Sequence, residues 1–319
     1  MEWRKQMEKT KVDVIIPTYK PDERFALLME RLLKQRLQPN HIYIINTIPS
    51  KGSDNDLTEP YRHMEQVSVV DILQQEFNHG GTRNQGVQMS QADFVVMMTQ
   101  DAVPADAHLL EALLEPFSDE KVAASYARQL ATKQVGIIEQ YTRTFNYPEE
   151  DSVKTLEDLP KLGIKTYFCS DVCAAYRKKT YEDMGGFVTK TIFNEDMIMA
   201  SKLIHAGYKI YYAAGAKVYH AHKYTGKQQF QRNFDLGVSH KEYCEIFDNV
   251  PSESEGIKMV KQTAGYLFKH GKPWKIAELV WQSGCKFLGY RFGKKYDRFP
   301  MWMVRMCSSQ KSYWEKGKE

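Results

Sequence analysis

The stretch Phe77–Asp101, with the sequence FNHGGTRNQGVQMSQADFVVMMTQD, indicates how the rest of this chain is organised. It predicts a glycine-rich loop, a helix over residues 83–90, a buried strand and a carboxylate just beyond that strand. Phe94–Met98 is a short continuous apolar run, which is typical of a parallel strand covered on both faces. Asp101 then lies at the carboxyl edge of the sheet, where open α/β sheets bind their ligands. The stretch therefore predicts an α/β fold with a binding site at this edge.

The glycine-rich loop has the chemistry of a phosphate-binding site. Its residues are Asn78, His79, Gly80 and Gly81. Thr82 is then placed to cap the helix that follows. Backbone N–H groups at such a helix start attract an anion, and a nearby carboxylate suits a divalent cation that would bind a diphosphate. A glycine pair alone is more often a plain turn, but this order of elements within one βαβ unit favours a nucleotide site.

The rest of the N-terminal half alternates strands with helices. Three more buried strands are predicted, at Val12–Pro17, His41–Asn46 and Val67–Ile72. Asp22–Leu37 carries apolar residues at helical spacing. This alternation predicts a doubly wound, mostly parallel sheet with helices on both faces.

The segments after Asp101 contain further polar groups that can reach the predicted site. Residues 129–160 are polar, and we expect a partly helical excursion over the site. Phe193–Ala206 predicts a helix that opens with acidic residues, and two short strands are predicted at Tyr208–Ala213 and Lys217–Tyr219.

Composition indicates a globular protein with a basic C-terminal end. The chain has 319 residues, 42% hydrophobic and 26% charged, with five scattered cysteines that do not complete a zinc set. The first residues lack the apolar core of a signal peptide, and no apolar run is long enough to span a membrane, so we expect a protein of the reduced cytosol. Residues 257–319 contain 14 Lys and Arg but 4 Asp and Glu, a net charge of +10. We therefore expect a catalytic domain over residues 1–250 and a basic helical extension over 251–319.

The basic extension alternates Lys and Arg with aromatic and aliphatic residues. It predicts one or two amphipathic helices, broken near Gly271–Pro273. Such helices lie on an anionic membrane surface with their apolar side down, or they dock as a pair on the catalytic domain. The apolar content is too high for a nucleic-acid-binding tail, so no nucleic-acid partner is expected.

Six motifs together resemble the inverting family-2 glycosyltransferases of the GT-A fold, over residues 12–240. They are VIIPTYK, FNHGGTRNQG, TQDA, FCSDVCAAYRK with GGF, NEDM with AGYK, and VYHAH. FNHGGTRN is similar to bacterial rhamnosyltransferases of polysaccharide assembly. The resemblance implies a nucleotide-sugar donor, a divalent cation (Mg²⁺ or Mn²⁺) and inversion at the anomeric carbon.

Two departures from the family pattern affect the donor and the metal. Asn46-Thr47 stands where many members have paired acids that hold uracil, which leaves room for thymidine. Gln100-Asp101-Ala102 replaces the Asp-x-Asp metal motif, so Asp101 is the one carboxylate ligand that the motif supplies. His220 and His222 alternate on an extended chain, so we expect one of them to reach the metal or the diphosphate while the other packs.

Inversion requires one carboxylate that removes the acceptor proton. The resemblance assigns this role to Asp196, with Glu195 as support or as an acceptor contact, although acids at a helix start also stabilise its dipole. Ser170 and Asp171 are expected at the acceptor. Arg83 and Arg232 are candidate phosphate ligands. The full set expected at the nucleotide sugar is Pro17, Thr18, Tyr19, Asn46, His79, Gly80, Gly81, Arg83, Asn84, Gln100 and Arg232.

These residues predict an enzyme that transfers L-rhamnose from dTDP-rhamnose to a saccharide or lipid-linked saccharide, at the inner face of the plasma membrane. One alternative is transfer of another sugar on the same fold, from a donor such as UDP-glucose or UDP-GlcNAc. Another is a catalytically inactive GT-A domain that acts as an assembly scaffold, against which the intact Asp101 and Asp196 argue.

Overall fold

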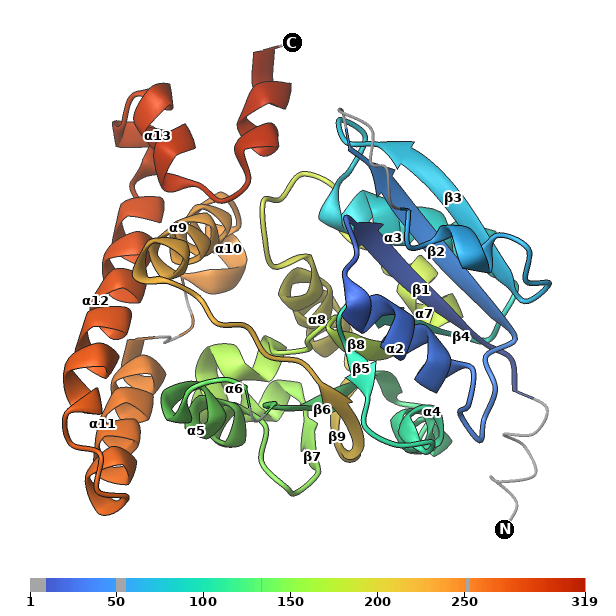
Figure 1. The fold of residues 1–319 in the computed structure, drawn as a ribbon, viewed down its shortest axis with the longest axis horizontal. Helices are drawn as coiled ribbons and strands as arrows, with labels where there is room; N and C mark the ends of the chain where they lie inside the picture. The colour runs from blue at the N-terminus through green and yellow to red at the C-terminus, as the bar shows by residue number, and fades with distance from the viewer. Residues whose placement is uncertain (1–9, 50–55, 133, 249, 251–252, 319) are drawn as a thin grey trace.

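A single mixed sheet forms the centre of the molecule, with helices on both faces (Figure 1). The computed structural model describes residues 10–49, 56–132, 134–248, 250 and 253–318. Within them nine strands pair in the order β3-β2-β1-β4-β8-β6-β9-β5, and β7 joins at β9. The predicted class, an α/β fold of GT-A type with a C-terminal helical extension, is confirmed.

The first four strands make the parallel half of the sheet. They are β1 (Val12–Tyr19), β2 (His41–Ile48), β3 (Val67–Leu73) and β4 (Phe94–Met98). Successive side chains of a strand point to opposite faces, so Val14 packs under α2 (Glu23–Leu32) and Ile15 packs under α3 (His79–Met89). Because both faces are covered, these strands are apolar throughout, as the sequence predicted.

The second half of the sheet mixes directions. It contains β5 (Val103–Pro104), β6 (Val122–Leu130), β7 (Ser152–Lys154), β8 (Cys173–Arg177) and β9 (Lys209–Tyr219). The two short strands predicted over 208–219 form one strand, β9, although its pairing with β6 skips residues 214–216, where the prediction separated them. The excursion over 129–160 is partly helical, as expected.

The remaining helices cover the sheet or the site. The α-helices are α4 (Leu109–Leu114), α5 (Ile137–Asn146), α6 (Leu159–Leu162), α7 (Lys178–Asp183), α8 (Glu195–His205), α9 (Gly226–Glu242) and α10 (Cys244–Phe247). Short 3-10 helices are η1 (Glu59–Tyr61), η2 (Glu115–Ser118), η3 (Leu156–Asp158), η4 (Gly163–Tyr167), η5 (Tyr296–Arg298) and η6 (Lys311–Lys318). α8 packs on the same face of the sheet as α3. This shared face brings the starts of the two helices together.

The helix after the glycine pair begins earlier than predicted. α3 starts at His79, and its cap is Asn78, whose Oδ1 accepts a 2.7 Å hydrogen bond from the Gly81 N–H. The expectation that Thr82 caps a helix over 83–90 is therefore wrong. Asn78 is the cap because its backbone is extended at the point where the chain enters the helix.

The C-terminal extension is a set of helices along one side of the molecule (Figure 1). α11 (Glu253–Lys269) and α12 (Lys275–Gly293) are separated at 270–274, close to the predicted break, and α13 (Met301–Cys307) follows. α12 lies against α9 so closely that a Cβ at Gly289 would be 2.2 Å from the Phe230 carbonyl oxygen. Among the described residues, no helix is both long enough and apolar enough to cross a bilayer.

Candidate active site

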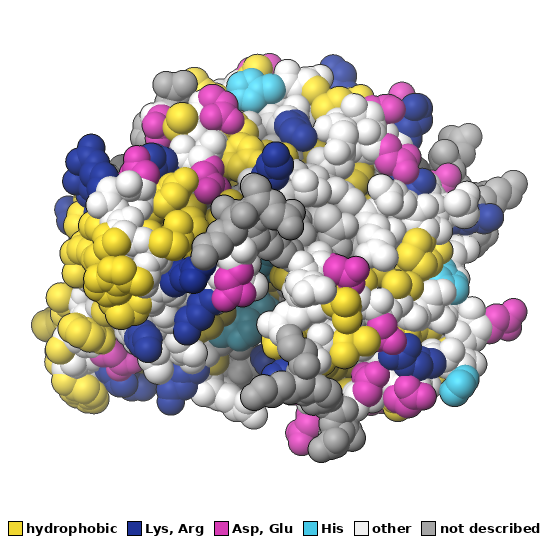
Figure 2. All heavy atoms as spheres, turned by 90° about the horizontal axis from the view of Figure 1, so that it is seen from above, with side chains coloured by type: hydrophobic (Ala, Val, Ile, Leu, Met, Phe, Trp, Pro, Cys, Tyr) yellow, Lys and Arg dark blue, Asp and Glu magenta, His cyan; other side chains and the backbone are white. Residues whose placement is uncertain are grey.

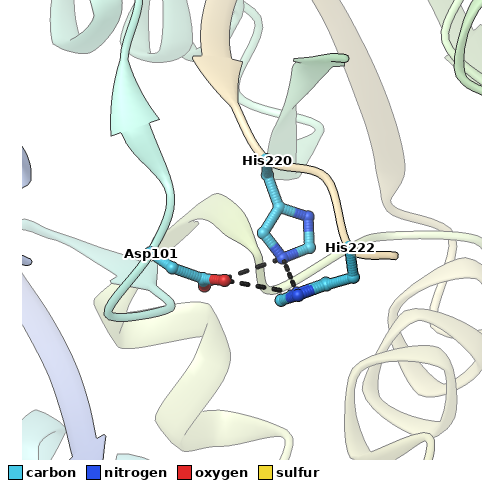
Figure 3. Close-up of side chains that lie close together, drawn as sticks. All are labelled: Asp101, His220 and His222. Atoms are coloured by element: carbon cyan, nitrogen blue, oxygen red, sulfur yellow. Dashed lines mark hydrogen bonds and ion pairs between the residues drawn. The ribbon is translucent and has the colours of Figure 1, made fainter. Parts of the chain in front are cut away.

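Three side chains converge beyond the ends of β4 and β9 (Figure 3). Asp101 lies between β4 and β5, and His220 and His222 follow β9 directly. The Asp101 carboxylate is 3.2 Å from His222 Nε2 and 3.7 Å from His220 Nε2, and the two Nε2 atoms are 2.9 Å apart. We call these three residues the cation cluster.

Both histidines face Asp101, so the expectation that one of them packs elsewhere is wrong. That expectation assumed an extended chain through residues 220–222, with alternate side chains on opposite faces. β9 instead ends at Tyr219, and the chain leaves the regular strand before it reaches the histidines. Strand alternation therefore does not apply to His220 and His222.

A glutamine that the sequence did not single out orients His220. His220 Nδ1 lies 2.9 Å from Gln129 Oε1, which can only accept, so this nitrogen carries the proton and Nε2 keeps its lone pair toward Asp101. Burial lowers the pKa of His220 well below its ordinary value. Burial also lowers the pKa of His222, although Asp101 opposes that effect. Both rings are thus neutral at pH 7, the form that binds metals.

The cation cluster has the donor set of a divalent metal site. One carboxylate and two imidazole nitrogens offer ligand atoms that all lie within 4.8 Å of one another. This mixed oxygen and nitrogen set suits Mn²⁺ and, with further oxygen ligands from a diphosphate, Mg²⁺. Gln100 does not join it, because its amide bonds to the Tyr19 backbone N–H at 2.7 Å and to the Tyr19 carbonyl at 3.1 Å. Gln100 therefore positions the loop, and its expected contact with the nucleotide sugar stays a prediction.

Three arginines make the surroundings of the cation cluster positive. Arg24 pairs with Asp101 at 3.2 Å, and the sequence had not indicated it. Arg143 and Arg232 both help to lower the pKa values of the two histidines, which places their charges nearby. Arg232 also stacks over the Tyr224 ring at 4.9 Å. Fixed positive charge of this kind stabilises a departing diphosphate.

A second cluster of charged residues lies at the start of α8. Asp196 is half-buried, and its Oδ1 accepts a 2.7 Å hydrogen bond from the Met197 N–H. Burial, with a further contribution from the charge of Glu195, raises the pKa of Asp196 to about 7. Asn194 precedes the pair in the left-handed region, at φ 66°, and so turns the chain into the helix. A carboxyl group that titrates near neutral pH is suited to accept a proton from a hydroxyl.

Glu195 and Asp171 hold Arg83 between them. Arg83 Nη1 is 3.1 Å from Glu195 Oε1, and Arg83 Nε is 3.7 Å from Asp171 Oδ2. Asp171 also accepts a 2.6 Å hydrogen bond from the Tyr176 hydroxyl and is 3% exposed. These partners hold the Asp171 side chain inside the protein, and its expected role at the acceptor or the sugar stays a prediction.

The start of α3 is closely packed against residues 187 and 188. The Gly81 N–H is used by the Asn78 cap, and a Cβ at Gly80 would lie 2.1 Å from the Val188 carbonyl oxygen. Asn84 bonds to the Phe187 carbonyl at 2.9 Å and accepts from the Phe187 N–H at 3.0 Å. The nucleotide-binding roles expected of Gly80, Gly81 and Asn84 stay predictions.

The sequence has clear relatives among known proteins. Residues 13–185 match the family described as Glycosyl transferase family 2. The chain belongs to that family. It is 37% identical over 308 residues to the O-antigen chain rhamnosyltransferase RfbN of Salmonella typhimurium, covering 95% of this chain and 96% of that protein. It is 39% identical to the O-antigen chain rhamnosyltransferase WbaN of Salmonella anatum, covering 94% and 95% of the two chains.

Solved structures share the fold of this glycosyltransferase at low identity. One is the mannosyltransferase PcManGT from Pyrobaculum calidifontis, in complex with GDP-Man and Mn²⁺, with a TM-score of 0.55 at 14% identity. It covers 98% of this chain, which covers 91% of it. S. aureus TarS (residues 1–349) has a TM-score of 0.51 at 15% identity, over 90% of this chain and 91% of that one.

One hydrogen-bond chain connects the two halves of the glycosyltransferase site. Gln129, which orients His220, also donates from Nε2 to Ser170 Oγ at 3.0 Å. The next residue, Asp171, directs its backbone N–H to Asp196 at 3.4 Å. Ser170 therefore lies between the cation cluster and Asp196. Gln129 lies near the end of β6, and no sequence pattern distinguished it as a site residue.

A third polar group lies at the ends of β1, β2 and β3. Thr18 donates to Asn46 Oδ1 at 3.0 Å, and Asn46 Nδ2 donates to Asp71 Oδ1 at 2.8 Å. Arg62 pairs with Asp71 at 2.9 Å. A cavity of about 130 Å³ opens beside them. Pro17 is in the same strand end, and Tyr19 is partly exposed there. The sequence predicted Asn46 here but missed Asp71 and Arg62.

Proposed function

We propose that this glycosyltransferase moves L-rhamnose from dTDP-rhamnose to a saccharide or lipid-linked saccharide in cell-surface polysaccharide synthesis. The observation that carries the choice of sugar is the 37–39% identity to two O-antigen chain rhamnosyltransferases over nearly the whole chain. The catalytic geometry supports transfer in one step, because a single acid with a raised pKa lies at the start of α8.

Asp196 accepts the proton of the attacking acceptor hydroxyl in this proposal. Glu195 keeps the pKa of Asp196 high, and Arg83 neutralises Glu195 from the other side. Asp101, His220 and His222 would hold Mg²⁺ or Mn²⁺, which supplies positive charge to the departing diphosphate. Arg24, Arg143 and Arg232 add to that charge. Arg83, which was expected at the phosphate, is 7% exposed and acts here as a positioning residue.

The nucleoside fits the polar group at the ends of the first three strands. Asn46 and Asp71 offer amide and carboxylate groups that match the N–H and C=O edge of a pyrimidine, and Thr18 holds Asn46 in place. Ile48 is partly exposed beside the same cavity, where an apolar side chain suits the thymine methyl group. This arrangement supports a thymidine nucleotide.

Ligand-induced thermal stabilisation tests the donor directly. The purified protein is heated with dTDP, UDP or GDP, each with and without Mn²⁺ or Mg²⁺. We expect dTDP with a cation to raise Tm most, and dTDP-rhamnose to label lipid-linked saccharide in membranes from a strain that lacks the gene. Stabilisation by UDP and transfer from UDP-sugars, without a response to dTDP, would contradict the proposal in favour of the alternative donors UDP-glucose or UDP-GlcNAc.

The C-terminal helices support binding at an anionic membrane surface, on the inner face of the plasma membrane. Ten large hydrophobic side chains on α11 to α13 and the turns between them are about half exposed or more: Ile257, Phe268, Trp274, Val280, Trp281, Phe287, Leu288, Met301, Trp302 and Met306. Figure 2 shows hydrophobic side chains gathered on the left, over these helices, with Lys and Arg around them. Aromatic and basic residues side by side are suited to the lipid headgroup region.

Docking and membrane binding are compatible here, since α12 contacts α9 through Gly289 and Gly293 and leaves Val280, Phe287 and Leu288 exposed. Truncation would uncover α9, so substitution is the better test. Phe268, Trp274 and Trp302 are replaced together by glutamate, and Leu156→Glu, an exposed change on η3, is the control. We expect the triple variant alone to lose co-sedimentation with phosphatidylglycerol vesicles. Equal sedimentation of both variants would contradict this surface.

A further inference from the structure

A pocket of about 550 Å³ lies between the start of α3 and the C-terminal end of the chain. Its lining comes from residues 77–79, from residues 189–192 and from the C-terminal Met301, Gln310, Ser312, Tyr313 and Trp314. The C-terminal part of this lining lies beyond the region that matches the family. Its volume is in the range of small-molecule sites. None of its residues belongs to the cation cluster or to the group beside Asn46.

One histidine connects this pocket to the proposed base. His79 Nδ1 is 4.0 Å from Glu195 Oε1, and His79 Nε2 is 3.3 Å from Gln310 Nε2. Glu195 is the neighbour of Asp196 in the first turn of α8. The His79 ring therefore has one edge toward the catalytic acids and the other toward the pocket. A molecule in the pocket would contact a ring whose other edge faces Glu195, the neighbour of the proposed base.

A buried carboxylate holds the C-terminal wall of the pocket in place. Asp235 of α9 is 1% exposed, and it accepts hydrogen bonds from the Ser308 hydroxyl at 2.6 Å and from the Ser309 N–H at 2.9 Å. Ser308 Oγ in turn accepts from the Gln310 N–H at 3.0 Å. These bonds fix the turn that carries Gln310. The position of its amide against His79 is thus built into the fold.

Apart from the exposed Lys190, the chemistry of the lining suits an uncharged sugar ring. Tyr313 contributes an aromatic ring. Its position is held by a 3.1 Å hydrogen bond from its hydroxyl to Glu242 and by edge-on packing against the Trp314 ring. The Gln310 amide and the His79 imidazole add planar groups that donate and accept hydrogen bonds. Apolar and aromatic walls with a few placed polar groups are the usual composition of a site that orients a small ligand.

We infer that this pocket binds a hexose unit of the acceptor saccharide, with Gln310 as a residue that determines acceptor specificity. The inference rests on the proposed function, because it needs a saccharide acceptor at Asp196. It also gives the C-terminal region a second role: α12 and α13 bring the chain back so that residues 308–314 complete the acceptor side of the site.

Kinetics of Gln310→Ala test the inference. Membranes from a strain that lacks the gene are titrated as acceptor, with dTDP-rhamnose as donor. We expect the apparent KM for acceptor to rise by about five- to tenfold, the usual effect of one lost hydrogen bond, with the KM for dTDP-rhamnose and its slow hydrolysis unchanged. Gln310→Glu keeps the side-chain shape and should show the same selective loss. Gln88→Ala, on the exposed side of α3, is the matched control. An unchanged acceptor KM in both Gln310 variants would overturn the inference.

A binding experiment without donor separates this inference from the proposed function. ¹H–¹⁵N spectra follow the indole signal of Trp314, identified with Trp314→Phe, during titration with methyl glycosides of glucose, galactose, mannose and rhamnose. We expect at least one glycoside to shift this signal in the wild type and much less in Gln310→Ala. If none does, the pocket assignment fails even where dTDP-rhamnose is turned over. If one does while dTDP-rhamnose is inert, the assignment stands and the donor is wrong.

Discussion

Asp101 and Asp196 lie at the same edge of the sheet, and the groups around them affect their negative charge in opposite ways. Asp101 faces two neutral imidazoles and the Arg24 guanidinium. The imidazoles can bind a cation together with the carboxylate, and the guanidinium can balance its negative charge in place of a cation. Asp196 faces Glu195 and little water, so burial and a like charge favour its protonated form. The difference teaches that the role of each acid depends on the charges around it, because the side chains are identical.

Removal of the proposed proton acceptor should have the largest effect. Asp196→Asn keeps the shape of the side chain but cannot take the acceptor proton, so we expect transfer to fall by about two to four powers of ten. Binding of dTDP with Mn²⁺ should stay within twofold of wild type, measured by calorimetry. If Asp196→Asn transfers normally while Glu195→Gln is inactive, the two acids have been assigned in reverse.

The same variant also reports on the cost of the buried charge. The folded-state pKa of Asp196, about 7, is above its ordinary value, so stability falls as pH rises toward 7 and stays lower above it. Asparagine carries no charge at any of these pH values. The Tm of Asp196→Asn relative to wild type should therefore rise more at pH 8 than at pH 5. An equal difference at both pH values would contradict the raised pKa.

Removal of Asp101, a proposed direct cation ligand, should have the next largest effect. We expect Asp101→Asn to lose the tightening of dTDP binding that Mn²⁺ produces, because two imidazoles alone hold the cation poorly beside three arginines. The loss of Mn²⁺ affinity, measured by the electron paramagnetic resonance of free Mn²⁺, should exceed the roughly 10–100-fold typical of outer-shell changes. Full activity of the wild type in EDTA would show that this cluster holds no catalytic cation.

A smaller effect is expected when Gln129, the hydrogen-bond partner of His220, is replaced. Gln129→Leu removes the acceptor of the His220 Nδ1 proton, so the ring is free to turn its protonated nitrogen toward the cation. We expect Mn²⁺ affinity to fall by about 10–100-fold. Gln129→Glu keeps an acceptor oxygen and should retain most of the affinity. If both variants bind Mn²⁺ like wild type, His220 does not depend on Gln129 for its orientation.

The smallest effect is expected when the negative charge of Glu195, beside the proposed base, is removed. Glu195→Gln removes a negative charge that helps to raise the pKa of Asp196. Transfer by wild type should increase through pH 7 as Asp196 loses its proton, and the midpoint for Glu195→Gln should lie at lower pH. At pH 8 the base is ionised in both, so kcat there should fall far less than in Asp196→Asn. A midpoint that does not move would show that Glu195 does not influence the base.

The class of fold could be read from the sequence because it depends on local apolar patterns. Phe94–Met98 and the three strands before it have the continuous apolar character that two-sided burial requires, and each forms a strand near its predicted bounds. Short apolar runs near Asp101 and Asp196 placed both acids correctly at element ends. The helix start at Asn78 was missed, since Asn78 and Thr82 could each cap a helix, and the backbone conformation decided between them.

The partners of these acids were decided by tertiary structure alone. Arg24 and Gln129 lie outside the motifs, and nothing in their local sequence distinguishes them from surface residues. They reach the site because sheet order brings β9 next to β6, and α2 next to the loop that carries Asp101. Gln310 reaches His79 across 231 positions, through α9 and Asp235. Local sequence determines helices and strands by periodicity, whereas contacts between distant residues depend on how those elements pack.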